Sequence, residues 1–354
     1  MLLALLACAP GTPKERIEPS FVEVTLDGVS TGSAEEPLPF STEPMDIALS
    51  IRTLDVNGDP WPMDGDLKPK VRPGVLESDP WVEISEGEWS GTVTIRNGFG
   101  QTRIWFSDEG DKDEDSGRDA SWAAGVSEAL WFASPTIAEI QESDDIETNQ
   151  LDGEFATVRV EDRSVVVTAR DAAGLWVTDI ADGTGTYNSM YVYTFNRPDS
   201  ALVVGARIDQ LTGIDQEYLA STQLSHPIIT TDGTTLEVPE AFELSDCDDT
   251  EMEGLEGARV QISDGEISSE FVEGSEDYAD FLLYGQWPLS YGSCTVYVES
   301  GSTAPDFDPT EHAGEIIPEV SGMVKQVFDK WVLVIVDAED IDAGESEPPS
   351  PGKE

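Results

Sequence analysis

Short runs of alternating apolar and polar residues dominate the chain from Phe21 onward. Examples are "FVEVTLDG", "MDIALSIRTLDVNGDPW" and "WVEISEGEWSGTVTIRNGFGQTRIWF". Gly, Asn, Asp or Pro interrupts the pattern about every ten residues, which is typical of strands joined by tight turns. Because apolar residues recur at every second position, they share one face of each run and can pack on a core, as in an antiparallel sheet. The sequence therefore predicts an all-β protein.

The runs after Leu151 occur in two copies. The segment "LDGEFATVRV" (151–160) aligns with "LEGARVQIS" (255–263), and "GARIDQLTG" (205–213) aligns with "GEIIPEVSG" (314–322). Each unit offers about five short strands with glycine at the sharp bends, which fits a small five-stranded barrel. We expect a duplication that forms two OB-like β-barrels.

The same pattern divides the chain into segments. The stretch "LSIRTLDVNGDPWP" resembles a bacterial immunoglobulin-like domain, because a strand runs into an Asp/Asn/Gly turn and then a proline. A short helix is expected near residue 137, with Ser134 as its N-cap and Pro135 at its first position. The expected order is a lipoprotein-type signal segment (1–8), a tether (9–20), an immunoglobulin-like β-sandwich (21–108), an acidic linker (109–134), a first OB-like barrel (135–238), a second OB-like barrel (239–345) and a disordered tail (346–354).

The charge of the chain restricts its partners. Only 19 Lys and Arg face 72 Asp and Glu, which gives a formal net charge of −53. Binding to DNA or RNA needs cations that displace the counterions of the phosphates, and this chain repels phosphate instead. We expect no nucleic-acid partner and no attraction to anionic lipid headgroups.

The amino terminus and the cysteines indicate an envelope location. The run "MLLALLAC" ends in "LLAC", which resembles the lipobox of bacterial lipoproteins and implies that Cys8 is lipidated. The run is short and lacks a preceding Lys or Arg, so we expect the true start to lie upstream. We expect no transmembrane helix, and a bacterial envelope protein held at the periplasmic or cell-surface side by its lipid. Cys247 and Cys294 then form an even pair, for which a disulfide is predicted and two separate thiols are the alternative.

A further resemblance concerns the first repeat. The segments "TIAEIQ", "LDGEFATVRVEDRSVVVTARDAAGLWVTD", "YVYTF" and "VVGARIDQLTG" are similar to the OB-fold domains that precede the catalytic domain of large bacterial secreted nucleases. The similarity covers about residues 135–235, and a looser second copy extends to about 342. It implies an accessory module rather than a nuclease, because no metal-dependent phosphodiesterase domain follows the barrels.

Calcium is the one metal that the sequence suggests, because acidic extracellular loops supply the oxygen ligands it requires. Asp55, Asn57 and Asp59 alternate as at the start of an EF-type loop, but Pro60 occupies the place of the turn glycine. A plain strand turn is the simpler interpretation. A second candidate group, for which a solvated charge run is the alternative, consists of Asp108, Asp111 and Asp113.

Aromatic residues form the best candidate for a binding face. Tyr191, Tyr193 and Phe195 alternate in "MYVYTFN", so they should share one face of a strand, with Trp176 on a neighbouring strand. On an OB-like barrel such a face can stack bases or sugars. The basic groove that accompanies nucleic-acid binding is missing, so core packing or a protein contact is favoured.

The sequence shows no catalytic motif. His226 and His312 are the only histidines, and no Gly-x-Ser-x-Gly elbow, His-Glu-x-x-His helix or phosphate loop occurs. Carboxylates are so numerous that residue type alone selects no glycosidase pair. We therefore expect no enzyme, but a lipid-anchored binding or scaffolding module for an envelope protein or glycan. A calcium-dependent adhesion or carbohydrate-binding module and an accessory subunit of a separate secreted nuclease are the alternatives.

Overall fold

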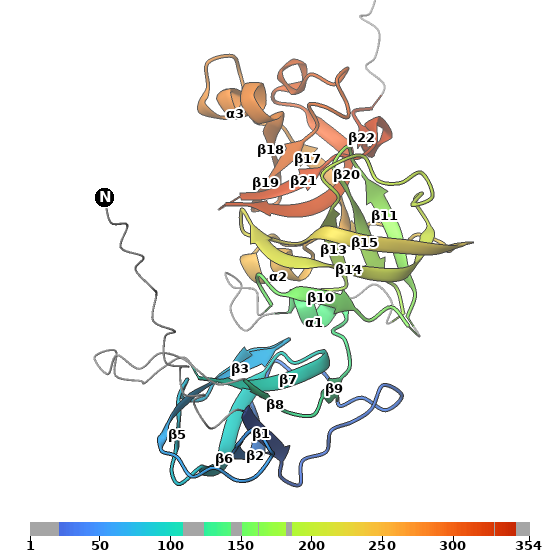
Figure 1. Cartoon of the computed structure of the whole chain (residues 1–354). Helices are drawn as coiled ribbons and strands as arrows, with labels where there is room; N and C mark the ends of the chain where they lie inside the picture. Colours follow the sequence, from blue (N-terminus) through green and yellow to red (C-terminus); the bar gives the residue numbers. More distant parts are fainter. Residues whose placement is uncertain are drawn as a thin grey trace, which may run out of the picture. The chain divides into compact units, whose positions relative to one another are not determined.

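The computed structural model of the chain describes residues 21–108, 124–142, 151–161, 163–181, 186–328 and 330–344. Cys8, Asp111 and Asp113 lie outside these residues, as do the tether and most of the acidic linker. The protein is mostly β, with 49% strand and 9% helix, as predicted. Two compact units divide at residues 133 and 134 and are described separately below (Figure 1).

The first unit consists of two curled sheets around one apolar core. Ile47, Leu49 and Ile51 show how the alternating pattern builds it, since all three are buried and their neighbours along the strand are not. One sheet has the order β1 (Phe21–Leu26), β2 (Met45–Leu54), β6 (Glu88–Arg96) and β4 (Val75–Leu76). The other has the order β5 (Val82–Ile84), β3 (Gly65–Arg72), β7 (Gly100–Ser107) and β8 (Gly125–Val126), and β9 (Leu130–Phe132) also pairs with β7.

The second unit contains two closed five-stranded barrels that are OB-like in size. Barrel 1 is built from β11 (Val165–Arg170), β12 (Gly174–Asp179), β13 (Ser189–Tyr193), β14 (Ala206–Tyr218) and β15 (Ser221–Thr235), and β10 (Phe155–Val158) also pairs with β14. Barrel 2 is built from β17 (Arg259–Glu266), β18 (Gln286–Tyr291), β19 (Cys294–Glu299), β20 (Ile316–Val327) and β21 (Lys330–Val334). The remaining elements are α1 (Ile137–Gln141), β16 (Phe242–Glu243), α2 (Asp249–Gly254), α3 (Glu276–Tyr284), η2 (Pro309–His312), η3 (Ala338–Asp340) and β22 (Ile341–Asp342).

Both barrels close in the same order. In barrel 1 the ring runs β11–β12–β13–β15–β14 and returns to β11, and in barrel 2 it runs β17–β18–β19–β21–β20 and returns to β17. One pair in each ring is parallel, namely β13 with β15 and β19 with β21. The hydrogen-bond registers also agree with the sequence repeat: Ala156 pairs with Gly213, and the aligned Val260 pairs with Gly322. The structure therefore supports the duplication.

The repeated glycines have a steric cause. A Cβ on Gly213 would lie 3.0 Å from Cβ of Leu224, and a Cβ on Gly322 would lie 3.1 Å from Cβ of Leu333. In both barrels the neighbouring strand thus approaches too closely for a side chain at this position. The first glycine of each pair, Gly205 or Gly314, has a positive φ of 85° or 82°, a conformation that favours glycine.

The two barrels pack against each other through the outer face of β12 and β13. Trp176 and Tyr191 on this face form a buried cluster with Ala169 of barrel 1 and Met323 of barrel 2. At one end the equivalent hairpin turns of the two barrels meet, because the amide of Phe328 donates to the carbonyl of Leu219 at 2.7 Å. The duplicated units are therefore in contact through corresponding turns.

Glu256 lies in this same interface. Its carboxylate accepts from the amide of Thr222 in β15 at 3.0 Å and from the amide of Gln326 in β20 at 3.4 Å, so it joins one strand from each barrel. Burial raises the pKa of Glu256 to about 8. Burial, together with Glu217, likewise raises the pKa of nearby Glu253 to about 7.

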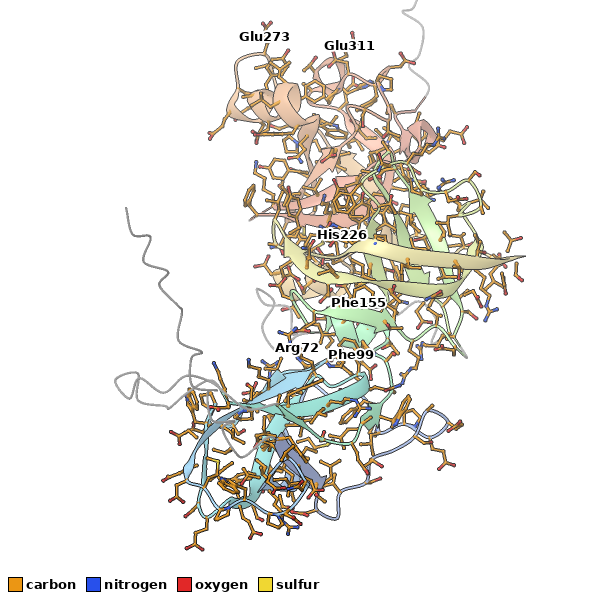
Figure 2. All side chains as sticks on the ribbon, in the orientation of Figure 1. Arg72, Phe99, Phe155, His226, Glu273 and Glu311 are labelled. Carbon is orange, nitrogen blue, oxygen red and sulfur yellow. A yellow bond between two sulfur atoms is a disulfide. The ribbon has the colours of Figure 1, made fainter. Side chains whose placement is uncertain are left out.

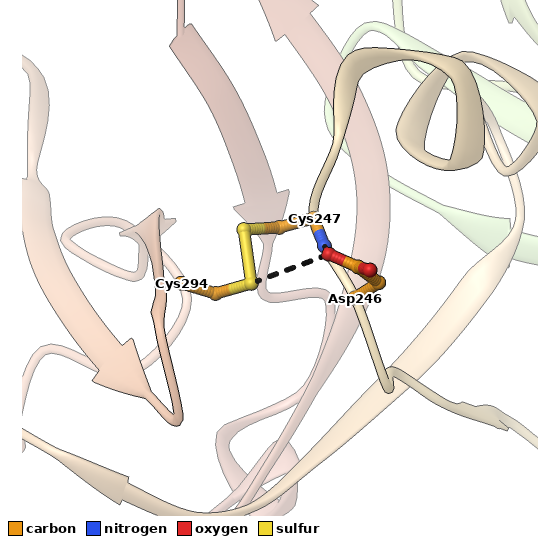
Figure 3. A group of neighbouring side chains, drawn as sticks. All are labelled: Asp246, Cys247 and Cys294. Atoms are coloured by element: carbon orange, nitrogen blue, oxygen red, sulfur yellow. Dashed lines mark hydrogen bonds between the residues drawn. A yellow bond between two sulfur atoms is a disulfide. The ribbon is translucent and has the colours of Figure 1, made fainter.

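The start of the second unit and the disulfide complete the fold. Helix α1 is capped by Thr136, not by Ser134 as predicted, because the Thr136 hydroxyl accepts from the amide of Glu139 at 3.1 Å. Cys247 and Cys294 form the predicted disulfide, which joins the segment before α2 to the start of β19 (Figure 3). No helix in the described ranges has the length and apolar character to cross a membrane.

Candidate functional site at the aromatic edge of barrel 1

The four aromatic residues selected from the sequence form one continuous row. Trp176 on β12 lies directly opposite Tyr191 on β13, with ring centroids 4.6 Å apart. The row continues from Tyr191 to Tyr193 at 6.5 Å and from Tyr193 to Phe195 at 4.4 Å. Exposure increases along it, from 2% for Trp176 and 8% for Tyr191 to 47% for Phe195. Only its outer end reaches solvent.

The inner end of the row serves the packing between the barrels. Besides the contact with Met323, the Lys325 ammonium of barrel 2 lies 5.7 Å from the centre of the Tyr191 ring. The Tyr191 hydroxyl donates to Asp171 at 3.0 Å, and burial and the nearby Asp171 carboxylate raise the pKa of this tyrosine strongly. Trp176 and Tyr191 therefore hold the two barrels together and do not present a stacking platform.

The outer end borders a surface hollow of about 440 Å³. His226 lies in β15, directly after Ser225, the residue that pairs with Tyr193 of the parallel strand β13. The His226 ring lies 4.6 Å from the Phe195 ring. Phe195 and His226 both have positive φ angles, of 63° and 50°. Bulky residues rarely adopt this conformation, and such strain gathers at functional sites. We call Tyr193, Phe195, His226 and the hollow beside them the aromatic edge.

The charges around the hollow are unusual for this chain. Arg197 and Asp199 both line it and are exposed. Among the described residues, Arg197 has no hydrogen-bond or ion-pair partner, although carboxylates greatly outnumber cations in this protein. The neighbouring Arg170 donates to the carbonyls of Pro198 and Asp199 at 2.9 and 3.1 Å, and so fixes the backbone of the loop that carries Arg197.

The chemistry of the aromatic edge suits binding. The rings of Phe195 and His226 offer apolar faces, and Arg197 offers a planar group of donors that fits carboxylates or other oxygen acceptors. In the part of the chain that the structure describes, the ring nitrogens of His226 make one hydrogen bond, to the hydroxyl of Ser225 at 3.3 Å. Among those described residues, no carboxylate orients this imidazole as a general base would require.

The two predicted calcium groups are not brought together. The Asp55 carboxylate accepts from the amides of Asn57 and Asp59 at 2.8 and 2.9 Å, so the turn is closed by its own hydrogen bonds. The amide of Asp59 is the main cause that lowers the pKa of Asp55. Asp108 is buried at the end of β7, and Asp111 and Asp113 lie outside the described residues.

Acidic side chains do converge next to the disulfide, where Asp246, Asp248 and Glu251 lie within reach of one another. Asp248 caps α2 through the amide of Glu251 at 3.0 Å. Figure 3 shows Asp246 beside the disulfide, with its Oδ1 4.0 Å from the sulfur of Cys294. Sulfurs joined in a disulfide are not thiolates, which are the form that binds metals, so Cys247 and Cys294 add no ligand to these carboxylates.

Sequence reasoning missed His226 and Arg197 as members of the site. Phe195 and His226 are distant in the chain and meet because β13 and β15 run parallel, with Tyr193 opposite Ser225. A pairing scheme for the five strands would have placed the residues after Tyr193 next to those after Ser225. The alternation pattern alone does not contain that information.

Comparisons with known proteins identify no relative. No family model matches the chain, and neither a curated protein nor a solved structure matches it.

Proposed function

We propose that this chain is a non-catalytic binding or scaffolding protein of the bacterial envelope, and that the aromatic edge is its ligand-binding surface. The observation that carries the proposal is the pair Phe195 and His226, two strained and exposed rings that border a hollow next to Arg197, which has no partner among the described residues. Folding gains nothing from that strain, which is the reason to assign it to ligand binding.

The location is part of the proposal. Disulfides persist in oxidising compartments outside the cytoplasm, and the Cys247–Cys294 bridge agrees with that setting. Lipidation at Cys8 would hold the protein at the membrane surface. Under this proposal the ligand is a protein or glycan of the envelope, because the charge of −53 disfavours nucleic acid.

We assign the two folds on strand pairing. In each barrel the first strand lies between the second and fourth, and the third and fifth run parallel, as in an OB-fold. The two curled sheets of the first unit, packed on one core, support an immunoglobulin-like sandwich. On an OB-fold, oligosaccharides bind to the face of strands two and three, which ends at Phe195 in barrel 1.

Carbohydrate binding is the second candidate function. The exposed ring of Phe195 and the nearby Arg197 and Asp199 provide the stacking surface and the polar groups that a sugar requires. The partly apolar hollow is equally suited to a protein side chain. The identity of the bound material distinguishes the two functions.

The test is crosslinking on intact cells of the source organism, with a photoreactive residue in place of Ile229 in the hollow. We expect one or two envelope proteins, or one glycan, to recur by mass spectrometry. Phe195→Ala should reduce their recovery about tenfold, since losing one exposed anchor ring removes roughly 1–2 kcal/mol of binding energy. The matched control is Phe155→Ala, since Phe155 is 49% exposed on β10 (Figure 2). Equal recovery from Phe195→Ala and wild type would refute the proposal.

A further inference from the structure

Helix α3 is inserted in barrel 2 at a connection that is short in barrel 1. Residues 267–285 join β17 to β18, whereas residues 171–173 make the corresponding connection from β11 to β12. In OB-folds this connection is one of the loops that contact ligands. Figure 1 shows α3 in this connection, next to one end of β18. The duplicated units thus differ most at a loop where the fold commonly carries function.

The last turn of α3 exposes three large apolar side chains. Leu282, Leu283 and Tyr284 are 67%, 71% and 63% exposed, and we call these three residues the α3 patch. They are consecutive, whereas single exposed apolar residues are common on protein surfaces. No residue of α3 is fully buried. Packing in the core of barrel 2 therefore does not explain why these three positions are apolar.

The helix is nevertheless held firmly against the barrel. On its inner side Phe281 and Tyr278 contact the buried ring of Phe271, with centroids 6.0 and 6.3 Å apart. The Lys330 ammonium of β21 forms an ion pair with Asp280 at 2.6 Å. Ser275 caps the first turn, and Gly285 ends the helix in the left-handed conformation. The patch is thus presented by an ordered element, as a binding surface requires.

The charge around the patch selects the partner. Residues 267–285 carry five carboxylates and neither Lys nor Arg. Glu270, Glu273 and Glu276 are exposed, and none has a side-chain hydrogen bond or ion pair with a described residue. Glu273 is labelled in Figure 2 at the outer end of this loop. A second copy of the chain or an anionic membrane would bring like charges together, which is unfavourable.

We infer that the α3 patch docks a basic amphipathic polypeptide segment, one whose apolar face is flanked by Lys or Arg. Leu282, Leu283 and Tyr284 bury the apolar face, and the carboxylates of residues 270–276 attract its cations. This surface lies on barrel 2 and does not depend on the aromatic edge, so either assignment can fail without the other.

The test uses the full chain and a labelled synthetic helix of about 18 residues with Leu on one face and Lys on the other. Fluorescence anisotropy at about 0.15 M salt measures the affinity. We expect Leu282→Ser/Leu283→Ser to weaken binding at least about tenfold, because two exposed side chains lose their burial in the complex. Glu273→Gln/Glu276→Gln should also weaken binding and reduce its dependence on salt.

Two control variants separate the patch from the general acidity of the chain. Ile228→Ser removes a side chain that is 54% exposed on barrel 1, and Phe195→Ala removes the aromatic edge. Both should bind the peptide as wild type does. Unchanged affinity of Leu282→Ser/Leu283→Ser would overturn the inference, because the peptide would then bind through charge alone. Leu282→Ser/Leu283→Ser could instead abolish a dimer seen by sedimentation, or abolish binding to neutral phosphatidylcholine vesicles. Either result would assign the patch to another occupant and would also overturn the inference.

Discussion

Barrels 1 and 2 share strand order and register, yet they use the same backbone positions differently. Gln223 and Val332 are equally far along the chain from the aligned glycines Gly213 and Gly322, so these two residues correspond. Tyr191 of barrel 1 pairs with Gln223, and Tyr297 of barrel 2 pairs with Val332, so the two tyrosines correspond as well. In barrel 1 this tyrosine is buried under barrel 2. In barrel 2 it is half-buried.

The residues opposite these tyrosines explain the difference. Tyr191 lies opposite Trp176 and makes an aromatic pair, whereas Tyr297 lies opposite Pro288. The Lys330 ammonium lies 4.2 Å from the centre of the Tyr297 ring. The aromatic face of barrel 1 packs against barrel 2. The corresponding face of barrel 2, with Lys330 over Tyr297, lies next to α3. Equal topology thus fixes where side chains point but not which partner they receive.

The largest effect is expected from a side chain at Gly174, the residue that lets the Tyr191 ring lie over β12. A Cβ there would lie 2.4 Å from the Tyr191 hydroxyl. Gly174→Val should displace the ring and destabilise the second unit by about 4 kcal/mol, measured by urea unfolding. The corresponding residue of barrel 2 is Gln286, which bonds Glu299 at 3.0 Å. Gln286→Val should cost only about 1 kcal/mol, and equal losses would contradict the asymmetry.

The disulfide belongs to barrel 2, so its removal should destabilise barrel 2 more than barrel 1. Cys247→Ala/Cys294→Ala frees a segment with a sequence separation of 47 residues and should lower the free energy of unfolding by up to about 4 kcal/mol in the chain-entropy model. Hydrogen exchange should show β18 and β19 losing protection before β12 and β13. Protection lost equally from both barrels would show that they unfold as one unit.

The buried Glu256 should make the contact between the barrels sensitive to pH. Its pKa is raised from 4.5 to about 8 by burial, so between these values the folded state keeps a proton that the unfolded state releases. Stability therefore falls as pH rises from about 4.5 to 8 and changes no further above that. Glu256→Gln should remove a decrease on the order of 3 kcal/mol between pH 5 and pH 8. Parallel pH profiles of urea unfolding for both proteins would contradict this.

The smallest effect on stability is expected at the aromatic edge. Phe195→Asn places a residue that tolerates positive φ where the bulky ring has a φ of 63°. Relief of strain offsets the lost contacts with Tyr193 and His226, so the free energy of unfolding should change by less than about 1 kcal/mol. Ligand recovery in the crosslinking experiment should nevertheless fall. A large loss of stability would show that Phe195 serves folding and not binding.

The sequence predicted much of the fold and part of the candidate site. Alternation predicted the strands, the repeated glycines predicted the duplication, and the even pair of cysteines predicted the disulfide. The row Trp176, Tyr191, Tyr193 and Phe195 was also predicted to share one face, and the ring contacts agree. The cap of α1 was placed two residues too early, because Ser134 and Thr136 are both good caps and only the bond to Glu139 selects one.

Tertiary structure alone decided which part of that row is exposed. Barrel 2 covers Trp176 and Tyr191, while His226 and Arg197 reach Phe195 through the parallel pairing of β13 with β15 and through a loop fixed by Arg170. The period of a strand specifies a face, but it carries no information about what packs on that face. Local sequence therefore determined the strands, the bends and the acidic surface, whereas contacts between distant segments determined the aromatic edge, the buried Glu256 and the exposed α3 patch.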